Sequence, residues 1–99
     1  MADLATDIRL AVDSGTAALG MNSVIDSIKN SSAKLVIIAT SAKKELRQDI
    51  MHIAKLATIN VINFEGTPVE LGAVCGKSFS VAVVSIIEPG NSSILANFK

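Results

Sequence analysis

A chain of 99 residues has the size of one domain, and we treat residues 1–99 as a single domain. Hydrophobic residues make up 49% of the sequence and charged residues 18%, a balance that excludes an intrinsically disordered chain. The single cysteine excludes an internal disulfide, and a formal net charge of zero excludes a broad basic surface. No apolar run of membrane-spanning length and no signal-peptide pattern are present, so we expect an intracellular, cytoplasmic protein.

The first third of the chain predicts a helix, a strand and a second helix. Apolar residues recur at helical spacing over about residues 3–14, and Thr16 to Leu19 form a short strand candidate. Asn22 is predicted to cap the second helix, because asparagine side chains accept hydrogen bonds from first-turn N–H groups. The apolar stripe of this helix is Val24, Ile25 and Ile28.

The middle of the chain predicts a buried strand, a long helix and another strand. Residues 34–39 contain five consecutive apolar residues rich in β-branching, which is typical of a strand buried on both faces. A helix is predicted over about residues 44–57, because its apolar residues follow the 3, 4, 7 spacing. A strand is then predicted over residues 61–64.

The strongest local signal of the chain lies at Thr67. Threonine at the cap, Pro68 at the first helical position and Glu70 at the third make a capping box, so a helix should run to about Cys75. A strand is expected over residues 81–87, and a last short helix over residues 92–96. Alternating strands and helices predict an α/β fold with helices on both faces of a sheet.

The residue types needed for catalysis or metal binding are scarce. His52 is the only histidine and should lie on the flank of its helix, while Cys75 has no second cysteine or nearby histidine. No nucleotide-binding motif is present either. We therefore expect no catalytic residue, no metal and no cofactor.

Three segments leave a structural and a binding interpretation open. The segment from Gly20 to Ser23 is explained either by turn geometry or by a phosphate site at a helix start. Phe79, beside Lys77 in a loop, could plug the end of the sheet or pack against an unstacked base. The basic cluster of Lys43, Lys44 and Arg47 is by itself more typical of a solvated helix face.

Several motifs in order along the chain carry a resemblance to a known family. They are Leu-Gly-Met-Asn-Ser at 19–23, the apolar strand at 33–39, Glu-Leu-Arg at 45–47, Glu-Gly-Thr-Pro-Val-Glu-Leu-Gly at 65–72, Cys-Gly-Lys at 75–77 and Glu-Pro-Gly-Asn-Ser at 88–92. With these motifs the chain resembles the kink-turn RNA-binding superfamily, and within it the archaeal and eukaryotic large-subunit ribosomal branch. The resemblance extends over roughly residues 8–95.

The resemblance implies a three-layer α/β/α sandwich on a four-stranded mixed sheet, without catalysis or cofactor. It also implies that ribosomal RNA of the large subunit is held by three adjacent loops, with neighbouring ribosomal proteins as further partners. Because the sequence has no ligand cluster and no long apolar helix face to spare, we expect a monomer when free. Carried over by matching positions, the RNA-binding residues are Gly20, Met21, Asn22 and Ser23 in the first loop, Thr40, Ser41 and Arg47 in or beyond the second, and Cys75, Gly76, Lys77, Ser78 and Phe79 in the third.

The chain also departs from the branch. Asn22 stands where the ribosomal branch often has lysine, and the second loop usually has an asparagine near Ser41, which leaves a side-chain contact there open. Two other functions stay under consideration. One is a sister kink-turn binder of small RNA–protein particles, and the other is a small cytosolic α/β ligand-binding or enzyme domain.

Overall fold

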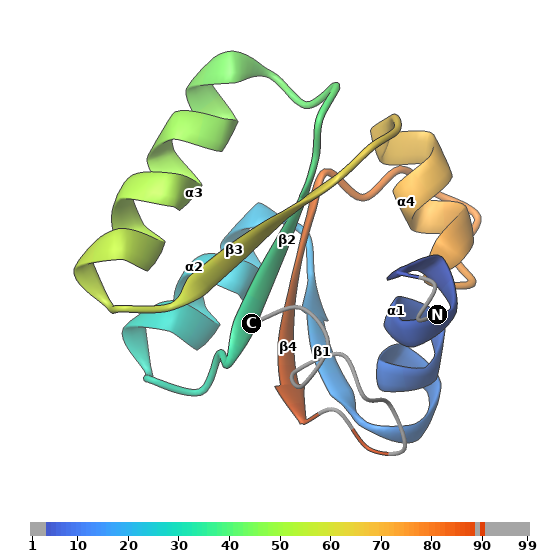
Figure 1. The fold of residues 1–99 in the computed structure, drawn as a ribbon, viewed down its shortest axis with the longest axis horizontal. Coiled ribbons are helices and arrows are strands. Elements are labelled where there is room, and N and C mark those ends of the chain that lie inside the picture. Colours follow the sequence, from blue (N-terminus) through green and yellow to red (C-terminus); the bar gives the residue numbers. More distant parts are fainter. Residues whose placement is uncertain (1–3, 89, 91–99) are drawn as a thin grey trace.

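Strands and helices alternate along the chain in the computed structural model, which describes residues 4–88 and Gly90. Figure 1 shows the arrangement, with the sheet between two pairs of helices. The elements are α1 (Leu4–Ser14), β1 (Thr16–Leu19), α2 (Met21–Lys29), β2 (Leu35–Ala39), α3 (Lys44–Leu56), β3 (Asn60–Phe64), α4 (Pro68–Val74) and β4 (Val83–Glu88).

The four strands form one mixed sheet in the order β1-β4-β2-β3. β4 is antiparallel to both β1 and β2, whereas β2 and β3 are parallel. Leu19 pairs with Val84, and Ala39 pairs with Phe64. The carboxyl ends of β1, β2 and β3 therefore lie beside the amino end of β4. We call this end of the sheet, where the connecting loops meet, the loop end.

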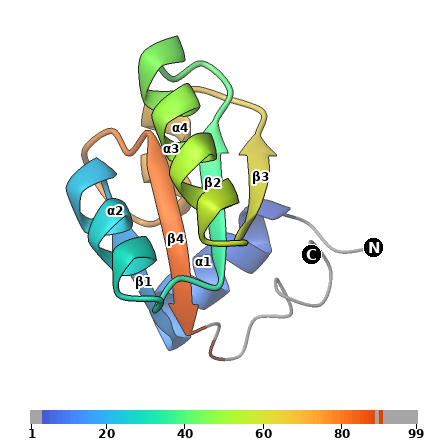
Figure 2. The same ribbon diagram turned by 90° about the vertical axis from the view of Figure 1, so that its left-hand side faces the viewer.

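The core consists of two apolar layers, one on each face of the sheet. The layer under α1 and α4 includes Ile8, Ala11, Leu71, Ile37 and Ile86, and the layer under α2 and α3 includes Val24, Ile28, Ile50, Val36 and Ile38. Successive residues of a strand point to opposite faces, so β2, buried at all five positions, contributes to both layers. Figure 2 shows the two helix pairs on opposite sides of the sheet. The predicted three-layer α/β/α class is confirmed.

Two local hydrogen-bond arrangements stabilise this framework. Glu70 N–H donates to Thr67 Oγ1 (3.1 Å) and Thr67 N–H donates to Glu70 Oε1 (3.2 Å), which confirms the predicted capping box. On the other face, the buried hydroxyl oxygens of Ser27 and Ser85 lie 2.8 Å apart and join α2 to β4.

Most predicted elements are found within one or two residues of their predicted bounds, with one clear error at α2. Asn22 is not the cap of this helix: the cap is Gly20, with φ of 88°, and the helix begins at Met21. Gly20 N–H donates to Val83 O (3.0 Å) and Gly20 O accepts from Val24 N–H (3.0 Å), so the strand passes directly into the helix. The helix predicted over residues 92–96 lies outside the described residues.

Candidate nucleic-acid interface

The loop end of the sheet contains a hollow of about 560 Å³. Three separate segments that follow or precede strands line it, together with the start of α4. Its lining residues are Gly20, Met21, Ser41, Ala42, Lys43, Leu46, Pro68, Ser80, Val81 and Ala82. The fold thus brings residues of the first and second predicted loops together with the segment that directly follows the third, Ser80 to Ala82, around one mostly apolar depression.

Hydrogen bonds fix the three segments relative to one another. Ala39 N–H donates to Ala82 O (2.9 Å), and Ser41 N–H donates to Gly66 O (3.2 Å). The Thr40 hydroxyl accepts from Gly66 N–H (3.2 Å), so this half-buried side chain joins the second loop to the turn before α4. The Thr40 hydroxyl is thus occupied by Gly66, and its role at this end of the sheet is to hold the second loop against the turn before α4.

Three helices begin at the loop end, and two of them lack a side-chain cap. Gly20 and Lys43 are the cap residues of α2 and α3, and neither provides a capping hydrogen bond from its side chain. The first-turn N–H groups of these helices are left without a capping side chain and carry the positive end of the helix dipole. Such helix starts bind phosphate groups well.

The first loop presents both polar groups and open backbone to solvent. Asn22 and Ser23 are exposed in the first turn of α2, and Met21 is half-buried at the hollow. Apart from Gly20 itself and its two chain neighbours, no heavy atom lies within 4 Å of the point where a Cβ on Gly20 would lie. A ligand can therefore approach the backbone of Gly20 closely.

Phe79 belongs to the surface and not to the core. Its side chain is 59% exposed, and the next residue, Ser80, lines the hollow. The interpretation of Phe79 as a plug for the end of the sheet is therefore wrong. A large exposed aromatic residue, next in sequence to a residue that lines the hollow, is suited to stacking on a base.

None of the other predicted residues of the third loop lines the hollow either. α4 starts at the hollow with Pro68, and its seven residues place Cys75 and Gly76 roughly 10 Å further along the helix axis, at 1.5 Å per residue. The Cys75 side chain is buried in the core, where burial raises the pKa of the thiol although the charges of Lys77 and Arg9 act in the opposite direction. Lys77 and Ser78 are exposed.

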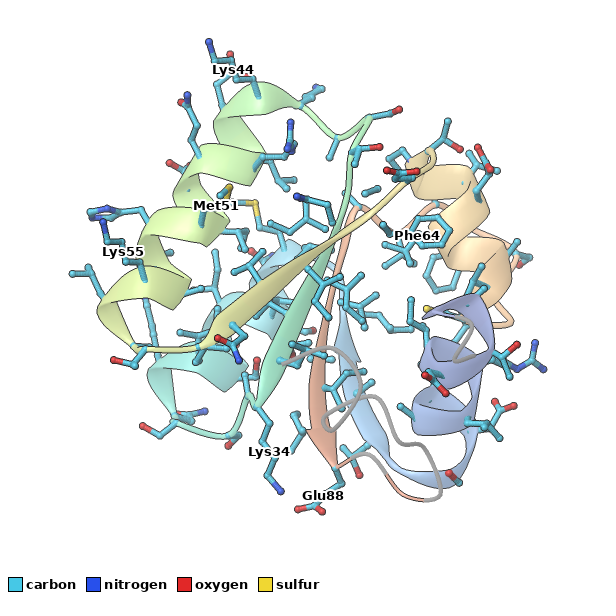
Figure 3. All side chains as sticks on the ribbon, in the orientation of Figure 1. Lys34, Lys44, Met51, Lys55, Phe64 and Glu88 are labelled. Atoms are coloured by element: carbon cyan, nitrogen blue, oxygen red, sulfur yellow. The ribbon has the colours of Figure 1, made fainter. Side chains whose placement is uncertain are left out.

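The basic residues of α3 begin at this end of the sheet. Lys43 lines the hollow, and the half-buried Arg47 has an Nε atom that is buried without a hydrogen-bond partner within the described chain. Figure 3 shows Lys44 at this end, whereas Lys34 and Glu88 lie at the opposite end of the sheet. His52 is exposed, as predicted for the flank of α3.

The described residues include no group of three or more histidine, cysteine, aspartate or glutamate side chains that could hold a metal ion. Within residues 4–88 and Gly90, no helix combines the length and the apolar character needed to cross a membrane.

Sequence reasoning missed several residues of the hollow. Ala42, Leu46, Pro68, Val81 and Ala82 line it, but small or apolar residues give no chemical signal in a sequence. The alternation of strands and helices, together with loop positions at the carboxyl ends of strands, was the signal available for them.

Fold and loop end together define an α/β/α domain with a hollow lined by three chain segments at one end of a mixed sheet. The chain belongs to the ribosomal protein L7Ae/L30e/S12e/Gadd45 family, whose model matches residues 2–96. This match confirms the family predicted from the sequence, and it identifies a structural protein and not an enzyme.

Similar proteins of known sequence come from archaea. A protein of Methanothermobacter thermautotrophicus named large ribosomal subunit protein eL30 is 46% identical over 93 residues, which cover 94% of this chain and 95% of that protein. A protein of the same name from Methanosphaera stadtmanae is 45% identical over 94% of this chain and 95% of that protein. Another from Methanobrevibacter smithii is 39% identical over the whole of both chains.

A solved structure shares the fold. It is that of a protein with unknown function from Bacillus halodurans C, with a TM-score of 0.83 and 22% sequence identity, covering 97% of this chain and 95% of that chain. At this identity, the likeness concerns the fold alone.

Proposed function

We propose that this protein is a structural constituent of the large ribosomal subunit and binds ribosomal RNA there. The support comes from the archaeal relatives, which are named as large-subunit proteins and match over nearly their whole length. The proposal includes a cytoplasmic location in the ribosome, neighbouring ribosomal proteins as partners, a monomeric free protein and no cofactor.

We further propose that the loop end holds kink-turn-like RNA, in which a sharp bend exposes unstacked bases. The observation that supports this mode is the convergence of three segments around an apolar hollow, beside two helix starts without side-chain caps. The hollow offers an apolar surface to an unstacked base, and the helix starts offer N–H groups to the bent backbone.

Individual residues take distinct roles in this arrangement. Gly20 allows close backbone approach, and the exposed Asn22 is placed to donate a hydrogen bond to a base edge or phosphate. The exposed Phe79, next in sequence to Ser80 of the hollow, stacks on a base. The half-buried Arg47, near the start of α3, offers its guanidinium group to a phosphate oxygen.

The test compares the affinity of protein variants for a fluorescent kink-turn RNA and for a straight duplex of the same length. Phe79→Ala should weaken kink-turn binding by about 5- to 150-fold, the equivalent of about 1 to 3 kcal/mol for a stacked base. Asn22→Ala should lower the affinity by roughly 3- to 10-fold, as expected for one hydrogen bond. Binding to the straight duplex should be weak for all of them.

Leu56→Ala is the matched control for Phe79→Ala. Leu56 is a large apolar residue, 74% exposed, at the opposite end of α3 from the loop end, so its loss should leave RNA affinity unchanged. If Asn22→Ala and Phe79→Ala both bind RNA like the parent while their melting midpoints are unchanged, the binding surface lies elsewhere on the molecule.

Two further measurements separate the competing functions. A ribosomal constituent should sediment with large subunits and crosslink to their RNA, whereas a sister protein of small RNA–protein particles should sediment in lighter fractions. A ligand-binding domain should instead show a small molecule in mass spectra of the purified native protein.

A further inference from the structure

The third loop folds back along α4 and is fastened to it. Gly72 is buried in the middle of the helix, and a Cβ at this position would collide with the backbone carbonyl of Phe79. Glycine inside a helix costs about 1 kcal/mol relative to alanine. The close approach of the Phe79 backbone explains why glycine is nevertheless found here.

Both ends of the loop are also tied to the helix by backbone hydrogen bonds. At the carboxyl end of α4, Gly76 N–H donates to Ala73 O (2.9 Å) and Lys77 N–H donates to Gly72 O (2.9 Å), with Gly76 at φ of 79°. This pattern is a Schellman motif, which reverses the chain direction. At the other end, Val81 N–H donates to Pro68 O (2.9 Å).

Arg9 of α1 packs against the point where the chain reverses. A Cβ on Gly76 would lie 2.9 Å from Arg9 Cζ and 3.0 Å from Arg9 Nη1, so the guanidinium covers the Gly76 backbone. Arg9 Nε–H donates to Asp13 Oδ2 (2.6 Å), which orients the guanidinium. A cation at this position also faces the negative carboxyl end of α4.

We propose that Gly72 and Arg9 are positioning residues that hold the third loop in its binding conformation, so that Phe79 is presented to RNA before RNA arrives. The inference rests on the proposed role of Phe79 in binding. Its physical content is preorganisation: a loop already fastened to α4 loses little conformational freedom when it binds. Neither residue needs to contact RNA.

The test is a double-mutant cycle between Arg9→Ala and Phe79→Ala, with affinity for the fluorescent kink-turn RNA as the readout. Arg9→Ala should weaken binding by about 3- to 10-fold in the parent protein, within the range for coupled residues. In the Phe79→Ala background the same substitution should have almost no effect, because there is no ring left to position. Amide hydrogen exchange at Lys77 and Val81, whose N–H groups donate to Gly72 O and Pro68 O, should become faster in Arg9→Ala in the free protein.

Lys34→Ala is the matched control for Arg9→Ala. Lys34 is an exposed cation whose ion pair with Glu88 (3.6 Å) resembles that of Arg9 with Asp13, and its side chain is 49% exposed against 52% for Arg9. Because Lys34 lies at the opposite end of the sheet, its removal tests the loss of one positive charge alone (Figure 3). RNA affinity should stay at the parent value.

Gly72→Ala provides a second, independent arm. It should displace the Phe79 carbonyl and weaken RNA binding in the parent background but not in the Phe79→Ala background. If Gly72→Ala does not fold, the Arg9 cycle alone decides the matter. An equal loss for Arg9→Ala in both backgrounds would show a direct contact with RNA and overturn the positioning role, as would no loss at all. If Phe79→Ala itself binds RNA like the parent, the proposed role of Phe79 in binding fails. That result differs from the two results for Arg9→Ala that overturn the positioning role.

Discussion

Removing the Thr67 hydroxyl should destabilise the fold by about 1 kcal/mol. Thr67→Ala deletes Oγ1, which accepts from Glu70 N–H at 3.1 Å and donates to Glu70 Oε1 at 3.2 Å, and it leaves that first-turn N–H to water. The reciprocal bond from Thr67 N–H to Glu70 Oε1 (3.2 Å) uses the backbone and survives, so only half of the capping box is lost. Capping substitutions of this kind cost about 0.5 to 2 kcal/mol.

Thermal unfolding of the free protein measures this cost. For a domain of this size, 1 kcal/mol corresponds to a decrease in Tm of roughly 4 to 8 °C. Thr67→Ser keeps an accepting oxygen and should stay close to the parent, which makes it the matched control. Since Glu70→Ala removes the other half of the same box, its cost and that of Thr67→Ala should not add in the double variant. An unchanged midpoint for Thr67→Ala would refute the assignment of Thr67 as a stabilising cap.

Three other predictions concern the core and the charge of the protein. Ser27 Oγ donates to Val24 O (2.7 Å), so Ser85 is the donor in the buried Ser27–Ser85 pair. Ser27→Ala leaves the Ser85 hydroxyl unpaired, at a cost of about 1 to 3 kcal/mol. Urea unfolding should therefore show a larger loss of stability for Ser27→Ala than for Ser85→Ala. The reverse order would show the opposite donor assignment. Because burial raises the pKa of Cys75, less thiolate is present at any given pH, and iodoacetamide should alkylate the native protein far more slowly than the protein in denaturant; equal rates would contradict a buried thiol. RNA affinity should fall with salt at a log–log slope of roughly −2 to −3, for three to four phosphate contacts, and a slope steeper than about −6 would reveal a basic surface not identified at the loop end.

The elements that sequence predicts well are those with a strong local signal. The five apolar residues of β2 are explained by burial on both faces, and the capping box at Thr67 fixes the start of α4 within the sequence itself. Asn22 shows where local preference fails. Asparagine is a favoured cap, but the Gly20 N–H pairs with Val83 O directly after β1, and the helix begins at Met21, before Asn22. That constraint comes from β4, more than 60 positions further along the chain.

The candidate site was predictable only in part, for a related reason. The positions of Gly20, Asn22 and Phe79 follow from a family resemblance, whereas the hollow itself depends on β4 lying between β1 and β2. No local pattern determines that strand order. Gly72 did carry a signal in the sequence, because glycine is unfavourable inside a helix. The reason for the glycine, the close approach of the Phe79 carbonyl, is visible only in the structure.

The same topology explains how a chain of zero net charge can serve as an RNA binder in the proposed complex. Each of α2, α3 and α4 follows the carboxyl end of a strand, so three helix starts meet at the loop end. The uncapped starts of α2 and α3 each contribute the equivalent of roughly half a positive charge that no count of side chains includes, whereas the Thr67 and Glu70 side chains already occupy the start of α4. Lys43, Lys44 and Arg47 add to this field at the start of α3, where Glu45 offsets only part of it. Because dipole fields act over about one helical turn, they favour phosphates held against the helix starts and contribute little attraction at a distance. Recognition of this kind selects an RNA whose bend brings its backbone to those points, and it rejects a straight duplex despite the same charge per nucleotide.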